Sequence, residues 1–354
     1  MRLLDFWHKE NFTRTEWNLS NQVQFGSQNL LVGKNAIGKS KTIQSIAQAA
    51  SQMAGKIDFD EFKDTETSLC LEANGYHYSY QFCCKGKNIV SESLKVNDEP
   101  IIIRNETETS IKGENINPPH DSLIIQTRRD VDNYPEIEKI VAWAENVRSF
   151  SFNELDDDYG DISPRSLGNR YSREGNRDLY SMLSSLSEEG RQRIVNSSNE
   201  IDFNLEKISI WNEIKIVLVK ERGIGDLLFQ DLSKGLRRTL YVLTCLAYFS
   251  EQDEPGLLLI DDLCEGLDYD RSIKLGKMVY DYCRDHSIQL IASSNDSFLM
   301  DIVDIDDWNI LTREGTSVKV MNKQSNPDLF ERFKMTGLSN FDFFSSDFIA
   351  RHTN

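Results

Sequence analysis

One stretch of the sequence has the residue types and the spacing that hold a phosphate group. It runs Gly33-Lys34-Asn35-Ala36-Ile37-Gly38-Lys39-Ser40 and fits G-x-x-x-x-G-K-[ST] at every position. Glycines let the backbone curl until its N–H groups face phosphate oxygens. Lys39 brings a positive charge to the β- and γ-phosphates, and Ser40 offers a hydroxyl to Mg²⁺. We therefore predict a P-loop that binds ATP and Mg²⁺, with contacts that extend to Lys41.

A second stretch, Leu257–Asp262, is an apolar run that ends in two acids. Such a strand buries itself and delivers carboxylates at its C-terminal end, where ligands bind in open α/β sheets. By itself the pattern indicates only a core strand. Beside a P-loop it predicts a Walker B strand, with Asp261 as a Mg²⁺ ligand and Asp262 as the group that activates water. Glu265 is the next candidate for that catalytic role.

A third stretch, Leu232-Ser233-Lys234-Gly235, precedes an apolar helical pattern. A serine and a glycine at a helix N-terminus create an anion site from backbone dipoles. Ser233 and Gly235 are therefore predicted to contact nucleotide. Without the other motifs, the same residues indicate only a capped helix start with basic residues.

The order of these motifs resembles that of ABC-type ATPases, and within them the RecF, SMC-like and OLD-type group. The resemblance implies three more nucleotide-site residues: Gln126 as the Q-loop residue that bridges Mg²⁺ and water, Asp268 as the D-loop aspartate, and Asn295 in place of the switch histidine. It also implies that two copies sandwich ATP, so that Ser233 of each completes the other's site. The family's catalytic glutamate is replaced by Asp262, which is one methylene shorter, and general-base geometry is strict. We expect slow hydrolysis.

Short apolar strands and helices must position these motifs. The expected strands are Arg2–Trp7, Thr15–Leu19, Asn29–Val32, Ser122–Gln126, Trp211–Val219, Gly256–Ile260 and Ile288–Ser293, with an antiparallel sheet over Ser68–Arg104. The expected helices are Thr42–Met53, Pro135–Val147, Leu179–Val195, Arg237–Phe249 and Ser272–His286. The phenylalanine-rich tail, Phe330–Phe348, is expected to pack on the body.

The predicted fold class is α/β, an ABC-type P-loop NTPase with a mainly parallel core sheet, an antiparallel β subdomain and a short helical arm or lid. We divide it into an N-terminal ATPase lobe (1–152), an insertion, arm or lid (153–205), and a C-terminal ATPase lobe (206–354). About a hundred residues separate Gln126 from Ser233, too few for the very long coiled coil of SMC-like repair proteins. About 60 residues follow Asn295, so we expect no Toprim nuclease domain in this chain.

Charge, hydropathy and cysteine content limit the classes of function that the chain can have. The net charge of −17 opposes nucleic-acid binding over most of the surface, and the sequence has no apolar run long enough to span a membrane. The six cysteines form no CxxC pair, so we expect reduced thiols and a cytoplasmic protein. One basic cluster could bind nucleic acid or an acidic partner, or be a solvated loop: Arg165, Arg170, Arg173 and Arg177.

The first functional hypothesis is a nucleotide-dependent dimeric switch, a homodimer or higher oligomer, as the ATPase component of an anti-phage system with a separate effector. That setting rests on family analogy. The alternative is a RecF-like repair ATPase that binds DNA directly, which the acidic charge opposes and the arginine cluster favours. A third class, the ATPase subunit of a transporter, is opposed by Asn295 and by the repair-type N-terminus.

Overall fold

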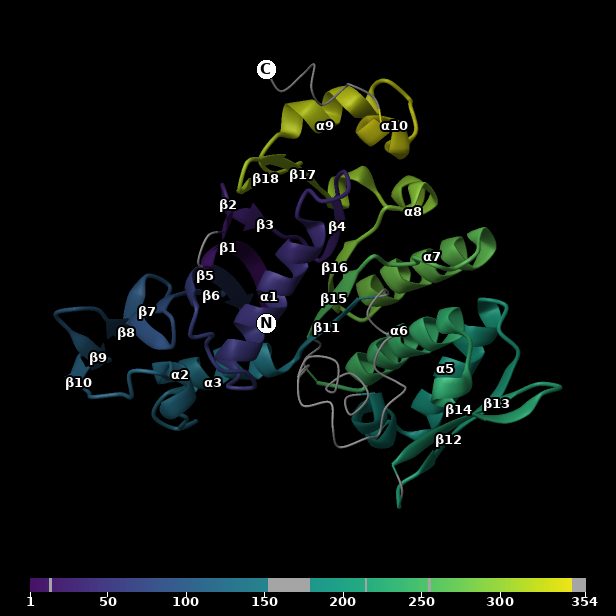
Figure 1. Ribbon diagram of the computed structural model, residues 1–354, viewed down its shortest axis with the longest axis horizontal. Helices are drawn as coiled ribbons and strands as arrows, with labels where there is room; N and C mark the ends of the chain where they lie inside the picture. Colours follow the sequence, from purple (N-terminus) through teal and green to yellow (C-terminus); the bar gives the residue numbers. More distant parts are fainter. Residues whose placement is uncertain (13–14, 152–178, 214, 254–255, 346–354) are drawn as a thin grey trace.

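The structure is a computed structural model that describes all residues except 13–14, 152–178, 214, 254–255 and 346–354 (Figure 1). Its large sheet contains β1 (Arg2–Phe12), β2 (Thr15–Leu19), β3 (Val23–Gln24), β4 (Gln28–Val32), β5 (Lys63–Ala73), β6 (Tyr76–Lys85), β7 (Asn88–Val96), β8 (Glu99–Arg104), β9 (Thr109–Ile111), β10 (Glu114–Asn115), β11 (Val147–Ser151), β15 (Leu257–Asp261), β16 (Gln289–Ser293), β17 (Trp308–Glu314) and β18 (Ser317–Asn322). A small sheet contains β12 (Leu205–Trp211), β13 (Ile216–Glu221) and β14 (Gly225–Leu228).

Helices surround these sheets. They are α1 (Lys39–Met53), α2 (Ile124–Thr127), α3 (Pro135–Glu145), α5 (Glu188–Glu200), α6 (Lys234–Ser250), α7 (Tyr269–Asp285), α8 (Ser297–Ile302), α9 (Pro327–Lys334) and α10 (Asn340–Ser345), with 3-10 turns η2 (Phe229–Asp231) and η3 (Ile305–Asp307). The predicted α/β class is confirmed, and most predicted elements agree with the structure to within a few residues.

The parallel core of the large sheet is the row β17-β4-β16-β15-β11, in which each neighbouring pair is parallel. All residues of β4, β15 and β16 are buried. Leu257 and Leu259 of β15 face the core that holds α1 and α3, whereas Leu258 and Ile260 face the core that holds α6 and α7. Helices therefore cover both faces, as apolar parallel strands require, and the carboxyl ends of these strands share one edge.

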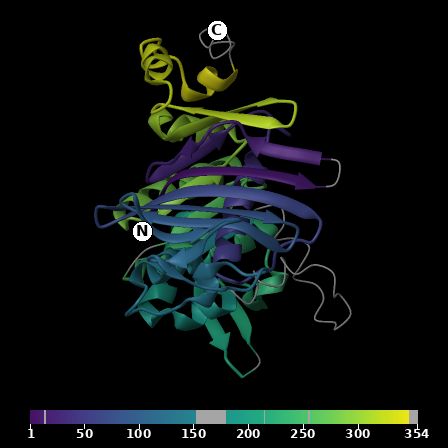
Figure 2. The same cartoon turned by 90° about the vertical axis from the view of Figure 1, so that its left-hand side faces the viewer.

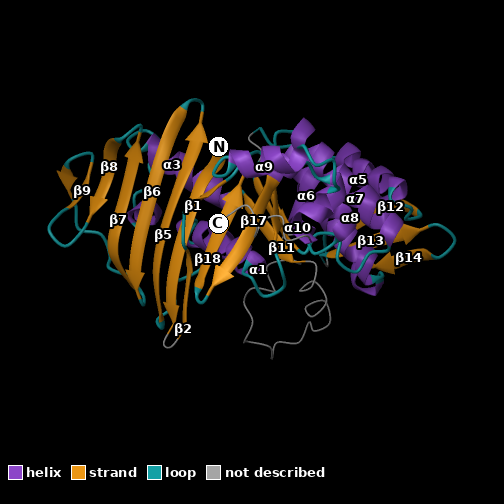
Figure 3. Cartoon of the chain, turned by 90° about the horizontal axis from the view of Figure 1, so that it is seen from above, coloured by secondary structure: helices purple, strands orange, loops and turns teal. Residues whose placement is uncertain are grey.

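The remaining strands of this sheet form the predicted antiparallel part. β5 to β8 pair in sequence order beside β1, with their outer face toward the viewer in Figure 2 and side by side in Figure 3. Asn74 and Gly75 both have positive φ, 53° and 79°, as the expected tight hairpin turn requires. Tyr78, Tyr80 and Phe82 are buried on the inner face at alternate positions.

Residues Ser122–Gln126 do not form the predicted strand. Leu123, Ile124 and Ile125 are buried, as an apolar run predicts, but the chain makes the helical turn α2. The buried carboxyl group of Glu92 explains the turn, because its oxygens accept bonds from the N–H groups of Ile124 (2.7 Å) and Ile125 (3.2 Å) and from the hydroxyl of Tyr80 (2.9 Å). This tertiary contact favours the helical turn over a strand.

Glu92 should make stability depend on pH. Burial raises its pKa from 4.5 to about 7, so the folded protein retains a proton that the unfolded chain releases. The contribution of the protonated Glu92 side chain to the stability of the fold is complete below about pH 4.5 and is lost as the pH rises through about 7. From about pH 5 to about pH 7.5, we expect the free energy of unfolding to fall by roughly 2–3 kcal/mol more in the wild type than in Glu92→Gln. Chemical denaturation of both proteins measures this difference, and parallel pH profiles would contradict it.

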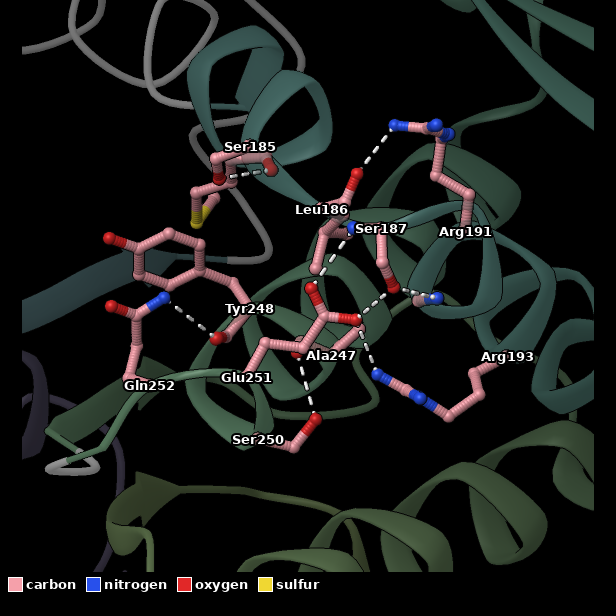
Figure 4. A network of polar contacts seen from close by, with 12 residues as sticks. Ser185, Leu186, Ser187, Arg191, Arg193, Ala247, Tyr248, Ser250, Glu251 and Gln252 are labelled. Atoms are coloured by element: carbon pink, nitrogen blue, oxygen red, sulfur yellow. Dashed lines mark hydrogen bonds and ion pairs between the residues drawn. The ribbon is translucent and has the colours of Figure 1, made fainter.

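Two other predicted elements are each divided in the structure. The expected helix Leu179–Val195 is helical over residues 179–185, stops at Leu186, and restarts as α5. Ser187 caps α5 and is held by Glu251, whose carboxylate accepts from its N–H (3.0 Å) and hydroxyl (2.6 Å) and pairs with Arg193 at 2.6 Å (Figure 4). The expected strand Trp211–Val219 contains the turn between β12 and β13.

The C-terminal tail packs on the body, as predicted, in its described part to Ser345. Phe330, Phe333 and Phe343 are at most 2% exposed and form a ring cluster in which Phe343 also contacts Trp308. The predicted insertion lies partly outside the described residues, and the arginine cluster at 165–177 lies wholly outside them.

Candidate nucleotide site

The P-loop connects β4 to α1 and adopts a backbone that its sequence permits. Ala36 and Gly38 have positive φ, 62° and 121°, a region that favours glycine at position 38. Gly33 is needed for space, because a Cβ there would lie 2.8 Å from Cγ2 of Ile37 and 3.1 Å from the carbonyl oxygen of Leu311. The loop therefore wraps tightly in front of α1.

Lys39 is the buried cation of this loop. Its side chain is folded back so that Nζ donates to the carbonyl oxygens of Gly33 (2.7 Å) and Lys34 (3.4 Å), and the residue is 5% exposed. Burial lowers its pKa, while the charges of Asp262 and Asp261 oppose that shift. The ammonium group thus lies between the loop carbonyls and the acids at the end of β15, where it can bind phosphate oxygens.

The two acids at the end of β15 have different environments. Asp261 is 5% exposed and accepts a 2.5 Å bond from the hydroxyl of Ser293, the last residue of β16. Asp262 has a positive φ of 55°, and its N–H donates to the same hydroxyl at 2.9 Å. Burial, then the charges of Asp261 and Glu265, raises the pKa of Asp262 to about 6. The amide of Asn295 donates to its carboxylate at 3.3 Å.

The P-loop, Asp262 and Asn295 line one pocket of about 550 Å³. It contains ten residues predicted from the sequence and two that were not: Asn35, Ala36, Ile37, Gly38, Lys39, Ser40, Lys41, Asp262, Glu265 and Asn295, with Trp17 and Arg313. Gly33 and Lys34 do not line the pocket, but their carbonyl oxygens accept from the Lys39 side chain, which does. Asp261 precedes Asp262 in the chain and shares its contact with the Ser293 hydroxyl. The structure therefore brings the P-loop, the acids and the switch-position asparagine together from three distant segments.

Sequence reasoning missed three residues of the site. Ser293 positions both acids. Arg313 of β17 donates to the carbonyl oxygen of Ala36 at 3.1 Å, which holds the tip of the P-loop. Trp17 of β2 presents an aromatic ring at the pocket, with the ammonium of Lys41 5.9 Å from its centre. Ser293 could have been found, because it is the last residue of the predicted strand Ile288–Ser293 and strand ends of a parallel sheet meet at the site. No sequence pattern marks Trp17 or Arg313, because only the pairing of distant strands places them at the pocket.

Gln126 is not brought to this pocket. Its amide nitrogen donates to the carbonyl oxygen of Gln52 at 2.5 Å, near the C-terminal end of α1, while the P-loop is at the N-terminal end. The proposed contact with Mg²⁺ is therefore not supported for Gln126. Beside β15, the sheet edge at the site is instead reached by the end of β11. The residues that follow its last residue, Ser151, lie outside the described ranges.

The signature residues and Asp268 also lie outside the pocket of their own chain. Ser233 is exposed and caps α6 by accepting from the N–H of Leu236 at 3.3 Å, and Asp268 caps α7 through the N–H of Arg271 at 3.1 Å. The start of α6 nevertheless touches the acidic loop. Arg238 donates to the carbonyl oxygen of Glu265 at 2.9 Å, and a Cβ at Gly235 would lie 2.9 Å from Leu267.

The donor set suits Mg²⁺ held jointly with nucleotide. Ser40 and Asp261 supply a hydroxyl and a buried carboxylate, and Mg²⁺ bound with phosphates commonly takes one or two such oxygens. In the part of the chain that the structure describes, no group of three or more His, Cys, Asp or Glu residues is arranged to hold a metal by itself. The same residues include no helix long and apolar enough to cross a membrane.

Taken together, the fold and the P-loop pocket define a P-loop nucleotide-binding protein whose fold is similar to that of SMC head domains. The chain belongs to the family described as "AAA domain, putative AbiEii toxin, Type IV TA system", whose model matches residues 29–301. The resemblance noted from the motifs is thereby confirmed.

Solved structures show the same fold. A SmcHead bound to the C-winged helix domain of ScpA has a TM-score of 0.56 and 12% identity, with 91% of this chain and 98% of that chain covered. An Smc head domain with an extended coiled coil, bound to the C-terminal domain of ScpA derived from Pyrococcus furiosus, has a TM-score of 0.54 and 10% identity, with 94% and 99% covered. No curated protein matches the sequence.

Proposed function

We propose that this protein is a Mg²⁺-dependent ATPase that works as a dimeric switch, in which two copies enclose two ATP molecules. One observation carries the proposal. The exposed, Ser233-capped start of α6 lies outside its own chain's pocket but is docked on the loop that lines that pocket. A helix N-terminus that attracts anions and does not line its own chain's pocket suits the nucleotide of a second copy.

The residues in and beside the pocket that can act on ATP have proposed roles. The P-loop N–H groups and Lys39 hold the β- and γ-phosphates, and Ser40 with Asp261 holds Mg²⁺, which neutralises phosphate charge when bound. Asp262 takes a proton from the attacking water, and Asn295 orients that carboxylate through its 3.3 Å hydrogen bond. A short acid and an amide at these positions support slow hydrolysis, so that ATP keeps the dimer closed for long periods.

Trp17 and Arg313 support a site for a whole nucleotide rather than for a bare phosphate. The indole ring of Trp17 lines the pocket although the residue is only 7% exposed, so it gives a base an apolar wall, and the guanidinium of Arg313 lies beside the P-loop. Gln126 and Asp268 are not part of this proposal. Gln126 is held at the far end of α1, and the carboxylate of Asp268 is bound to its own helix.

The biological setting follows the family. Its description names a "putative AbiEii toxin" of a type IV toxin–antitoxin system. The proposed anti-phage switch that acts through a separate effector protein rests on family analogy. The alternative, direct DNA binding as in RecF-type repair, rests on the arginines at 165–177, outside the described residues. A gel shift with double-stranded DNA in low salt separates the two: a shift that salt weakens supports the alternative.

Ser233→Arg tests the dimer. Bulk and positive charge at the start of α6 should block the ATP-linked contact, while the fold is retained because Ser233 is exposed. In analytical ultracentrifugation with the non-hydrolysable analogue AMP-PNP and Mg²⁺, we expect the wild type to dimerise and Ser233→Arg to stay monomeric. The rate of hydrolysis should fall about 100-fold or more, the usual cost of losing a contact made in the transition state.

The matched control for that experiment is Ser20→Arg, which adds the same charge at an exposed serine beside β2. It should dimerise and hydrolyse ATP like the wild type. Hydrolysis by Ser233→Arg at the wild-type rate would mean that Leu232–Arg238 is only a capped helix start.

A further inference from the structure

Two large aromatic side chains pack against each other on the surface next to the nucleotide site. The rings of Tyr269 and Phe298 meet edge to face, with centres 4.3 Å apart and planes at 89°. Tyr269 is 53% exposed and Phe298 is 44% exposed, and Ile302 on the same helix as Phe298 is 41% exposed. A cluster of exposed apolar groups of this kind is a common mark of a protein–protein contact.

Each ring is attached to a segment that lines the pocket. Tyr269 opens α7, four residues after Glu265, and Phe298 is in α8, three residues after Asn295. The two helices are packed closely at Gly276, where a Cβ would lie 2.5 Å from the side chain of Leu299. The aromatic pair therefore links the acidic loop to the switch-position segment on the outside of the molecule.

Tyr269 also follows the loop that connects the two surfaces that a dimer would join. The loop 265–267 lines the pocket through Glu265 and contacts the start of α6 through Leu267. If Ser233 of each copy reaches the other's pocket, the two-fold axis passes between these surfaces, and the residues midway meet their own copies. Tyr269 follows that midway loop directly.

We propose that Tyr269 and Phe298 form the central self-contact of the ATP-linked dimer, with the same pair of a second copy of this chain as its partner. The inference rests on the proposed dimeric switch and names the residues that anchor it. Two copies with a net charge of −17 each repel one another, and an uncharged aromatic centre supplies attraction without adding to that charge. Because the rings follow Glu265 and Asn295, movement at the γ-phosphate end of the pocket would change the contact.

The test compares dimer dissociation constants by sedimentation velocity with AMP-PNP and Mg²⁺. We expect the double variant Tyr269→Ala, Phe298→Ala to raise the constant about tenfold or more, as for central aromatic residues of interfaces. Tyr269→Phe, which keeps the ring, should stay within about twofold of the wild type. So should the control Trp211→Ala, which removes a 56% exposed aromatic side chain from β12. The affinity of each variant for AMP-PNP, measured at dilutions where all proteins are monomeric, should equal that of the wild type. This measurement shows that each variant is folded.

A second arm locates the contact. Tyr269→Cys, in a background with Cys70 and Cys83 changed to serine, should form a disulfide-linked dimer under an added oxidant only when AMP-PNP is present. The inference is overturned if the wild type dimerises but the double variant dimerises equally tightly, or if Tyr269→Cys forms no crosslink. Either result leaves the proposed dimeric switch intact. A wild type that stays monomeric with AMP-PNP overturns both.

Discussion

Lys39→Ala is expected to abolish tight ATP binding, with a dissociation constant raised about 100-fold or more, as for a buried charge removed from its partner. The reason lies in the other cations of the pocket. Lys41 is bound to Glu10 at 2.6 Å, and Arg313 donates to Ala36 and Gly315. Neither is placed to replace the ammonium group that lies between the loop carbonyls and the acids. Isothermal titration calorimetry with ATP and Mg²⁺ measures the effect.

Lys95→Ala is the control, because it removes an exposed lysine from β7 in the antiparallel part of the sheet. It should bind ATP like the wild type. Equal affinity of Lys39→Ala and the wild type would contradict the assignment of the P-loop pocket as the nucleotide site. Thermal melts of the two variants separate loss of binding from loss of folding.

Asp262→Asn is expected to remove most hydrolysis, by about 100-fold or more, the range for a general base. The carboxylate is the group at the end of β15 that is held by Asn295 and whose pKa is raised to about 6. A general base works when it has lost its proton. The wild-type kcat/KM should therefore rise as the pH increases through about 6 and level off above it, and Asp262→Asn should lack this step. Phosphate release at a series of pH values measures both.

The absolute rate of the wild type bears on the same residue. We expect it to lie below the ~10 s⁻¹ that is the median for enzymes, because the acid is short and an asparagine replaces the switch histidine. Faster turnover would show that the site is not impaired. An unchanged rate in Asp262→Asn would move the base to Glu265, which lines the same pocket, and Glu265→Gln would then be the variant that loses activity.

The nucleotide chemistry could be predicted from the sequence because local pattern determines it. A P-loop needs only glycines, a lysine and a serine at fixed spacing between a strand and a helix, and Gly33–Ser40 has them. Asp261 and Asp262 follow the same logic, since an apolar strand that ends in acids delivers them to one edge of a parallel sheet. The hairpin at Asn74 and Gly75 is equally local, because its turn depends on two residues that tolerate positive φ.

Other features depend on contacts between distant segments, and the sequence alone does not determine them. Ser122–Gln126 has the composition of a buried strand but forms a helical turn, because Glu92, about thirty residues earlier, accepts its N–H groups. The same turn places Gln126 at the end of α1 far from the P-loop, so a role assigned from motif order did not match its position. Glu251 likewise divides a helix that its periodicity predicts as continuous.

The sequence by itself determined that this protein has a P-loop, an acid pair and an α/β fold, because these follow from residue spacing and from apolar periodicity along short segments. Only the tertiary structure placed Trp17 and Arg313 at the pocket and set Tyr269 against Phe298 on the surface. Those residues come from separate strands and helices, and their proximity depends on how the sheet pairs and how α7 packs on α8. Such long-range packing leaves no periodic trace in the local sequence.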